Sequence, residues 1–292
     1  AEGSGVKKVF TALYETDTVG GKDGNGNDIG DGIPDKYQIL VTYKVVHGTW
    51  SDDTTADITK YLTTKDNQGK WLEGSAGGTA PVERPTGMKA DTGYENGTWD
   101  DATTMAISVA ATFKHTFTPI VYTITYNGLD GATVSGNLAT YTIESNDITL
   151  TNPTKTGYTF KGWTGDGLTS ASMSVTIPKG SVGNRTYTAT WEANAQTITY
   201  PPEQDDDDTP ANKDEDLKFD DVIQVIVTPG TWDMADGLTA VGTDNKYIIK
   251  GNVDLGKPTP ADGDVFLGWD VTDGAEGSGV KKVFTALYET DT

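Results

Sequence analysis

The segment that decides the fold is YTITYN at residues 122–127, in which every second side chain is aromatic or aliphatic. A period of two places Tyr122, Ile124 and Tyr126 on one face of an extended chain, as in a half-buried strand. The same alternation returns at residues 186–191. The chain also has 35 glycines, many threonines and few leucines. This composition favours strands and turns, so we predict a mainly β fold.

The pattern around this segment occurs more than once along the chain. The letters FKGW at residues 160–163 correspond to FLGW at residues 266–269. Residues 93–99 keep the Gly-Tyr and Trp spacing of residues 157–163. We therefore predict three small modules built on one plan, each large enough for a modest core of its own.

The predicted modules are separated by shorter segments. The predicted boundaries are 1–18 for the closing strand of a preceding repeat, 19–35 for a calcium-binding linker, 36–118 for a divergent first module, 119–200 for the second, 201–216 for an acidic linker and 217–292 for the third. In the first module, residues 107–113 would be the closing strand. Ile58 and Leu62 stand four residues apart, which predicts a short helix over residues 55–63.

The acidic linker is predicted from its composition. Residues 201–216 contain eight acidic residues against Lys213, with three prolines and almost no hydrophobic side chain. Such a segment cannot bury a core of its own. We therefore expect it to be extended, to make few backbone hydrogen bonds and to be sensitive to proteases.

Three motifs together carry a family resemblance: YTITYN at residues 122–127, PTKTGYTFKGW at 153–163 and YTATW at 187–191. This combination resembles the Listeria–Bacteroides repeat, also called the internalin B-repeat. The resemblance implies three tandem β-grasp-like modules in an elongated array, of the kind strung along secreted or wall-attached bacterial proteins. It implies no catalytic residues. The third module lacks the Thr-Gly-Tyr sequence that precedes the shared strand in the second.

The two ends of the chain have the same sequence. Residues 1–18 are identical to residues 275–292, an offset of 274 residues. This identity predicts a parent protein that repeats with that period. Residues 283–288 should be the closing strand of the third module, with alternate side chains in its core. Residues 9–14 should either pack on the first module as an added strand or replace residues 283–288 of a neighbouring molecule.

The charge and residue content exclude several classes of partner. The formal net charge is −21, which argues against nucleic acid and against an anionic membrane surface. No apolar run of 18 residues occurs, so we expect no membrane insertion. Cysteine is absent, so an extracellular protein of this kind would be held by packing, by metal or by other cross-links.

A calcium site is predicted in an acidic, glycine-rich stretch over residues 23–35. Its oxygen-bearing positions follow the 1, 3, 5, 7 and 9 spacing of a calcium loop. Asp28 stands where such a loop needs glycine, and Pro34 stands where it needs glutamate, a role that Asp35 could take. The alternative is a solvated glycine-rich turn. The candidate ligands are Asp23, Asn25, Asn27, Ile29 (through its carbonyl), Asp31 and Asp35.

Aromatic and titratable residues are the candidates for ligand binding and for catalysis. Tryptophans at recurring positions favour a buried core over a sugar-binding face, because burying them gives a small core its largest hydrophobic gain. Trp71 lies outside the shared pattern and is the better candidate for exposure. His47 and His115 are predicted to be surface histidines, and neither a Gly-x-Ser-x-Gly nor a His-Glu-x-x-His motif is present. The recurring tryptophans are Trp163, Trp191, Trp232 and Trp269.

The sequence therefore predicts a protein that is not an enzyme. We expect a structural stalk or spacer segment of a repetitive bacterial cell-surface adhesin, located outside the cell, that holds a distal binding domain away from it. Its partners would be neighbouring repeats of the same chain. The alternative is a module of a secreted surface protein that binds carbohydrate or a host protein.

Overall fold

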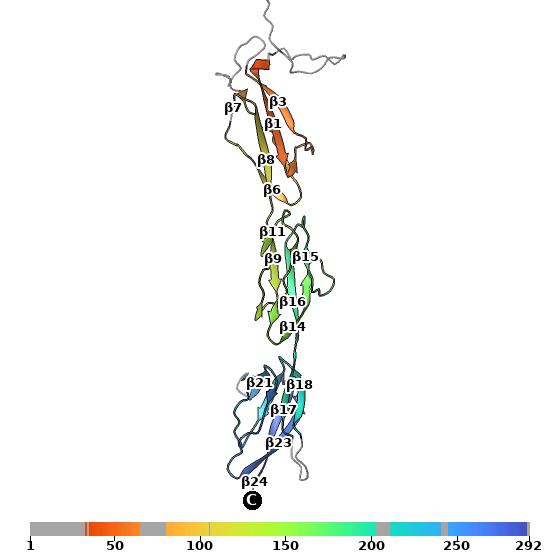
Figure 1. The fold of residues 1–292 in the computed structure, drawn as a ribbon, viewed down its shortest axis with the longest axis vertical. Coiled ribbons are helices and arrows are strands. Elements are labelled where there is room, and N and C mark those ends of the chain that lie inside the picture. Colours follow the sequence, from red (N-terminus) through yellow and green to blue (C-terminus); the bar gives the residue numbers. More distant parts are fainter. Residues whose placement is uncertain are drawn as a thin grey trace, which may run out of the picture. The chain divides into compact units, whose positions relative to one another are not determined.

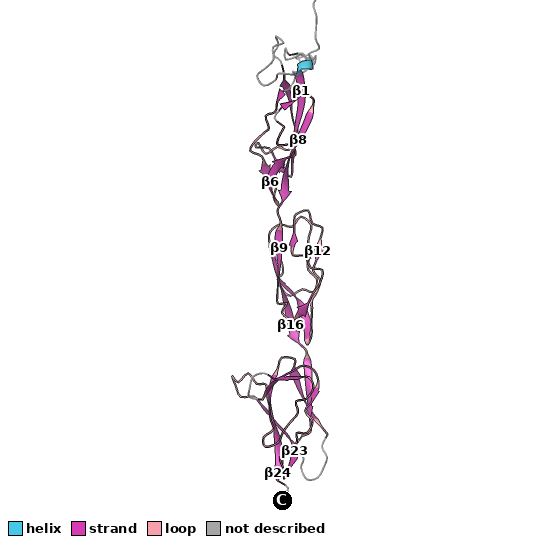
Figure 2. Ribbon diagram, turned by 90° about the vertical axis from the view of Figure 1, so that its left-hand side faces the viewer, coloured by secondary structure: helices cyan, strands magenta, loops and turns pink. Residues whose placement is uncertain are grey.

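The computed structural model describes residue 33 and residues 35–64, 80–104, 106–202, 211–240 and 245–290. Strands dominate these residues, and the helical element among them is the short 3-10 helix η1 (Asp35–Tyr37) (Figure 2). The prediction of a mainly β protein is therefore confirmed. Among the described residues, no helix has both the length and the apolar character needed to cross a membrane.

The chain divides into two compact units. The first contains residues 1–122 together with the short segments 141–145 and 179–182. The second contains residues 123–140, 146–178 and 183–292. Three groups of sheets are distributed over these units, and we call them the first, second and third modules, at residues 35–119, 122–193 and 195–290 (Figure 1).

The first module is built on a four-stranded sheet with the order β3-β1-β8-β6, and two small sheets pair β2 with β5 and β4 with β7. Alternate residues of β1 point into the core, where Val41 and Tyr43 are fully buried. The strands are β1 (Gln38–Val46), β2 (Gly48–Thr49), β3 (Ile58–Thr63), β4 (Ala80–Pro81), β5 (Lys89–Ala90), β6 (Tyr94–Trp99), β7 (Ala106–Ile107) and β8 (Ala111–Pro119).

The second module has a six-stranded sheet with the order β10-β13-β14-β16-β9-β11, and a separate pair joins β12 to β15. Trp163 and Tyr187 are buried between these sheets. The strands are β9 (Tyr122–Asn127), β10 (Ala132–Thr133), β11 (Thr140–Tyr141), β12 (Ile148–Thr149), β13 (Thr154–Lys155), β14 (Tyr158–Gly165), β15 (Thr176–Ile177) and β16 (Arg185–Ala193).

The third module combines a five-stranded sheet, β20-β21-β19-β24-β23, with a three-stranded sheet, β18-β17-β22. One core holds Ile198, Ile249, Trp269 and Phe284 together. The strands are β17 (Ala195–Tyr200), β18 (Lys213–Lys218), β19 (Val222–Ile226), β20 (Leu238–Ala240), β21 (Lys246–Ile249), β22 (Val253–Asp254), β23 (Asp264–Asp273) and β24 (Lys282–Thr290).

All three modules share one strand plan. In the largest sheet of each module, the last strand along the chain pairs in parallel with the first strand of that sheet, as β8 with β1, β16 with β9 and β24 with β19. On its other edge it pairs antiparallel with the strand that precedes it within that sheet, as β8 with β6, β16 with β14 and β24 with β23. Each antiparallel pair contains a register shift, so the common plan extends to the bulge.

Two expectations for the first module differ from the structure. Residues 58–63 form strand β3 and not a helix, because β3 pairs along its whole length with β1 and this tertiary pairing overrides the four-residue spacing of Ile58 and Leu62. The closing strand is β8, which begins at Ala111. The stretch predicted for it, residues 107–113, only overlaps the start of that strand.

The acidic linker also differs from the structure. Its last residues belong to β18, which pairs antiparallel with β17 from Tyr200 and Lys213 to Ala195 and Lys218. Both strands therefore lie in the third module. A strand needs an apolar residue on one face only, and here Leu217 fills the core while Asp216 points into solvent. Residues 203–210 lie outside the described residues.

The closing strand of the third module agrees with the sequence prediction. Residues 283–288 lie within β24, and alternate residues Phe284 and Ala286 are buried in the core. The identical residues 9–14 lie outside the described part of the chain, as does Trp71.

Candidate functional site: two Gly-Tyr contacts

The most specific side-chain arrangement in the second unit surrounds Gly157 and Tyr158, at the start of β14. The backbone of Gly157 has φ +79°, and the ring of Phe219 lies where a side chain at Gly157 would begin. The ring of Phe219 also meets the ring of Tyr158 edge-on, at 5.5 Å between centroids. The Tyr158 hydroxyl donates a short hydrogen bond to the Asp220 carboxylate. Phe219 and Asp220 follow β18, so this contact joins the second module to the third.

Backbone hydrogen bonds hold the same place. The amide of Asn194 donates to the carbonyl of Gly157 at 2.9 Å, and the amide of Phe219 donates to the carbonyl of Asn194 at 2.9 Å. The side chain of Asn194 accepts a hydrogen bond from the Thr159 hydroxyl at 2.7 Å. Asn194 is the residue between β16 and β17, so the connection between the two modules is tied to both of them.

The first unit contains an equivalent contact. Gly93 has φ +86°, and a side-chain carbon there would lie 2.7 Å from Ile143. The hydroxyl of Tyr94 donates to the Glu144 carboxylate at 3.1 Å. The amide of Ile120 donates to the carbonyl of Gly93 at 2.9 Å, as Asn194 does to Gly157. In both places a Gly-Tyr pair faces an apolar residue that is followed by an acid.

Both tyrosines are covered on one side by a basic side chain. The imidazole of His47 stacks on the Tyr94 ring, with 4.3 Å between centroids and 5° between planes. The Lys155 ammonium lies 4.2 Å from the centre of the Tyr158 ring. These contacts fix the ring orientation and so aim each hydroxyl at its carboxylate.

The acidic partners change the ionisation of both tyrosines. The hydrogen bond to Asp220 raises the pKa of Tyr158 to about 12, with lost hydration as a smaller cause. The pKa of Tyr94 is raised mainly by lost hydration, and then by its hydrogen bond to Glu144. Both hydroxyls therefore stay protonated at neutral pH and act as donors.

The third module has no such pair at the corresponding place. The residue after Gly263 is Asp264, at the start of β23. Gly263 also has a positive φ, +87°, but a side chain added there would meet no atom within 4 Å. The three glycines thus share one backbone conformation, and only two of them face another segment.

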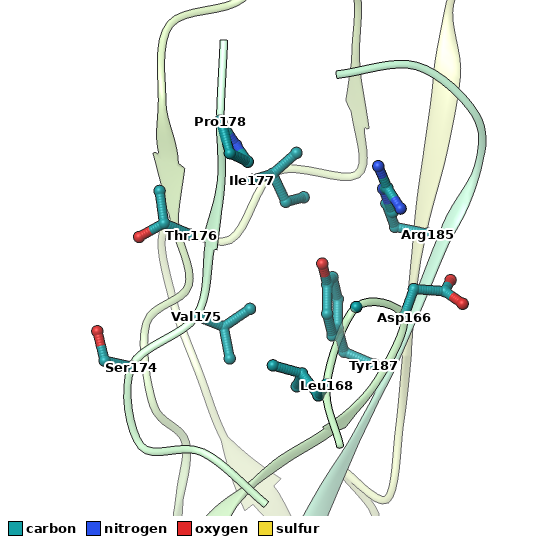
Figure 3. Close-up of a pocket in the computed structure, with 10 residues that line it drawn as sticks. Asp166, Leu168, Ser174, Val175, Thr176, Ile177, Pro178, Arg185 and Tyr187 are labelled. Atoms are coloured by element: carbon teal, nitrogen blue, oxygen red, sulfur yellow. The ribbon is translucent and has the colours of Figure 1, made fainter. Parts of the chain in front are cut away.

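One pocket of about 360 Å³ lies in the second module (Figure 3). Leu168, Val175, Ile177 and Tyr187 converge on it, whereas Thr176 points away. These four are mostly core residues, and Val175, Ile177 and Tyr187 are buried. The pocket is therefore the partly open end of the hydrophobic core.

A second pocket, of about 350 Å³, has a more aromatic lining. Tyr158, Phe160 and Trp191 contribute to it together with Lys155. The indole N–H of Trp191 donates to the carbonyl of Gly128 at 2.7 Å, so its edge is already used within the module. A ligand bound in this pocket of the second module would therefore contact aromatic rings.

The tryptophan predictions divide into two groups. Trp163 and Trp269 are almost completely buried, as predicted for core residues. Trp191 and Trp232 are half-buried and donate hydrogen bonds to backbone carbonyls.

The prediction for the histidines holds for one of the two. His47 is exposed, but His115 is buried between Trp99 and Phe117, because alternate residues of β8 face the core. Burial lowers the pKa of His115, and a backbone hydrogen bond with Gly97 opposes this in part.

Most of the predicted calcium ligands lie outside the described residues. This applies to Asp23, Asn25, Asn27, Ile29 and Asp31, whereas Asp35 begins η1. Within the described residues, no group of three or more histidine, cysteine or acidic side chains could hold a metal ion.

Comparison with known proteins gives a match to a family model, and it covers the second module. No curated protein matches this chain. Residues 122–195, which run from the start of β9 to the residue after Asn194, match the family model described as the divergent InlB B-repeat domain.

Proposed function

We propose that this chain is a non-enzymatic spacer segment of a bacterial cell-surface adhesin, located outside the cell, that holds a distal binding domain away from it. The match to a B-repeat domain supports a repeat module of a bacterial surface protein. The proposal includes a β-grasp-like fold for each module, which the parallel pairing of the first and last strands of each largest sheet supports. The calcium site over residues 23–35 stays a prediction.

The observation that carries the proposal is the pair of Gly-Tyr contacts. A spacer keeps its two ends a fixed distance apart only if bending at the junctions between its modules is restricted. At Gly157 the restriction comes from a ring contact, a tyrosine–carboxylate hydrogen bond and two backbone hydrogen bonds. At Gly93 a tyrosine–carboxylate hydrogen bond, an apolar side chain over the glycine and one backbone hydrogen bond recur, as expected of a structural joint.

Backbone ¹⁵N relaxation of the full chain tests this function. In the wild type, the amides of the second and third modules should report one common rotational correlation time. Phe219→Ala removes the ring that covers Gly157, so the two modules should then report different correlation times. Tyr158→Phe removes only the hydroxyl and should have a smaller effect. Separate correlation times in the wild type would contradict the spacer proposal.

A matched pair of glycine variants controls for backbone strain. Gly157→Ala and Gly263→Ala both place a side chain on a left-handed residue, which costs about 1 to 2 kcal/mol by itself. Only Gly157→Ala also displaces Phe219. It should therefore separate the tumbling of the two modules, whereas Gly263→Ala should not.

The aromatic pocket favours one second function. Rings of Tyr158, Phe160 and Trp191 beside Lys155 are the side chains that a carbohydrate site uses. A glycan array probed with the wild type and with Trp191→Ala tests it. Binding that Trp191→Ala abolishes would favour a carbohydrate-binding module, and no binding to any glycan would dismiss it.

A further inference from the structure

We propose that two copies of this chain associate by strand exchange, in which residues 8–16 of one copy occupy the place of β24 in the third module of the other. The occupant is named by the sequence, because residues 1–18 are identical to residues 275–292. This interaction goes beyond the spacer role and does not depend on it.

The place of β24 is defined on both edges. It pairs in parallel with β19 and antiparallel with β23, so it lies inside the five-stranded sheet. Phe284 is fully buried and meets the ring of Tyr200 edge-on at 5.4 Å. The hydroxyl of Tyr288 donates to the carbonyl of Val227 at 2.9 Å. The corresponding residues of the first segment, Phe10 and Tyr14, supply the same groups.

The residues just before β24 and its first residue, Lys282, are duplicated too. Val280 is buried, and its backbone closes against Gly274. The amide of Lys281 donates to the carbonyl of Val222 at 2.6 Å. Lys282 forms ion pairs with Glu215 and Asp273, each at 3.1 Å. Every donor and apolar group on the β24 side of these contacts lies in residues 275–292, so the first segment carries a full second set.

Identical side chains make identical contacts, so exchange changes the contact energy very little. Mass action then sets the exchanged fraction, which should rise with protein concentration. Because β24 is an inner strand, the resident copy must leave before another can enter. Exchange should therefore be slow under native conditions and fast during refolding from denaturant.

Cysteine cross-linking detects the exchanged strand directly. Val265 on β23 pairs with Glu289 on β24, and Glu15 is the counterpart of Glu289. The wild type has no cysteine, so a Glu15→Cys, Val265→Cys variant of the full chain contains only the probe pair. After refolding at high concentration and oxidation, exchange should give reducible dimers and longer oligomers. Cross-strand neighbours are close enough for a disulfide.

Two controls distinguish a cross-link caused by strand exchange from one formed within a molecule or by random collision. The Glu289→Cys, Val265→Cys variant should form an intramolecular disulfide in the same register. Chains with Glu15→Cys alone or Val265→Cys alone should give far fewer cross-linked dimers than the pair. If the pair cross-links no better than the single variants, or only within one molecule, exchange between copies is excluded.

A pair of phenylalanine variants tests the energetics without cysteine. Phe284→Ala weakens the resident strand but not the incoming one, so it should raise the exchange constant by roughly a hundredfold or more, given the cost of deleting a buried ring. Phe10→Ala has the opposite design and should abolish the oligomer while the monomer keeps its stability. Light scattering after refolding measures both. Equal oligomer content in the two variants would overturn the proposal.

Discussion

The first and second modules share a strand plan but differ at the residue opposite the tryptophan of their antiparallel pair. Trp163 on β14 pairs with Ala189 on β16, and its ring is fully buried. Trp99 on β6 pairs with His115 on β8, and its ring is only half-buried. The third module repeats the second, with Trp269 opposite Ala286.

The size of the residue opposite the tryptophan therefore decides how deeply the indole ring is buried. An alanine leaves space for the indole in the core, whereas the His115 imidazole occupies that space and meets Trp99 edge-on at 5.2 Å. The Trp99 ring also packs against a second aromatic ring, that of Tyr43, with 5.9 Å between the two centroids. The same plan thus holds two kinds of core.

The largest expected effect is the loss of the tryptophan itself. Trp163→Ala should destabilise the second module by about 3 to 5 kcal/mol, because it empties a fully buried site. Trp99→Ala should cost the first module about half as much, because part of that ring is already hydrated. Native-state hydrogen exchange of β14 and β6 amides measures each module separately. Equal losses of stability in the two variants would contradict the difference in tryptophan burial inferred for the two modules.

The next effect concerns the glycine of each bulge. Gly162 has φ +121°, and an added side-chain carbon would lie 2.8 Å from the backbone of Ser172, so Gly162→Ala should cost about 2 to 3 kcal/mol. Gly97→Ala would instead meet two side-chain rings, that of His115 and, at 2.8 Å, that of Phe117.

This second effect has an internal control. His115→Ala should restore part of the stability lost in Gly97→Ala, because it removes the nearer of the two obstructing rings and leaves Phe117 room to move. No variant of Ala189 should rescue Gly162→Ala. Hydrogen exchange of β8 and β16 amides measures the two cases, and a Gly97→Ala variant that His115→Ala does not rescue would contradict this account.

A smaller effect is the pH dependence of the first module. Burial lowers the pKa of His115 below its ordinary value of 6.5, so the unfolded state binds the proton more tightly. Stability is therefore complete above pH 6.5 and falls as the pH decreases from there towards the folded pKa. Hydrogen exchange between pH 5 and 7.5, corrected for intrinsic rates, should show this loss in the wild type. His115→Ala places at this position the residue that the second module has, and it should remove most of this pH dependence.

The smallest effect tests the surface of the bulge. Lys161 pairs with Glu192 at 2.8 Å on the second module, and the third module has Leu267 at the same place. Both partners are more than half exposed, so Lys161→Leu should change stability by no more than about 0.5 kcal/mol. A thermal melt of the full chain measures this, and a loss above about 1 kcal/mol would mean that the ion pair matters more than its exposure allows.

Sequence patterns predicted the elements whose evidence is local. The alternation at residues 122–127 is strand β9, and the repeated letters at 283–288 lie in β24. Burial of Trp163 and Trp269 was predicted from their recurring positions in the sequence. These features depend on side-chain period and residue size, which are properties of a short stretch of sequence.

Other features depend on partners that are distant in the chain. Residues 213–216 appeared too acidic for a core, yet β18 forms because β17 offers a strand edge and the adjoining Leu217 fills the third core. The Gly-Tyr pairs were visible in the sequence, but their acidic partners Glu144 and Asp220 lie 50 and 62 residues away. Alternation and recurrence are thus properties that can be read from the sequence. The partners of these residues cannot be, because hydrogen bonds and ring contacts depend on which strands the fold brings side by side.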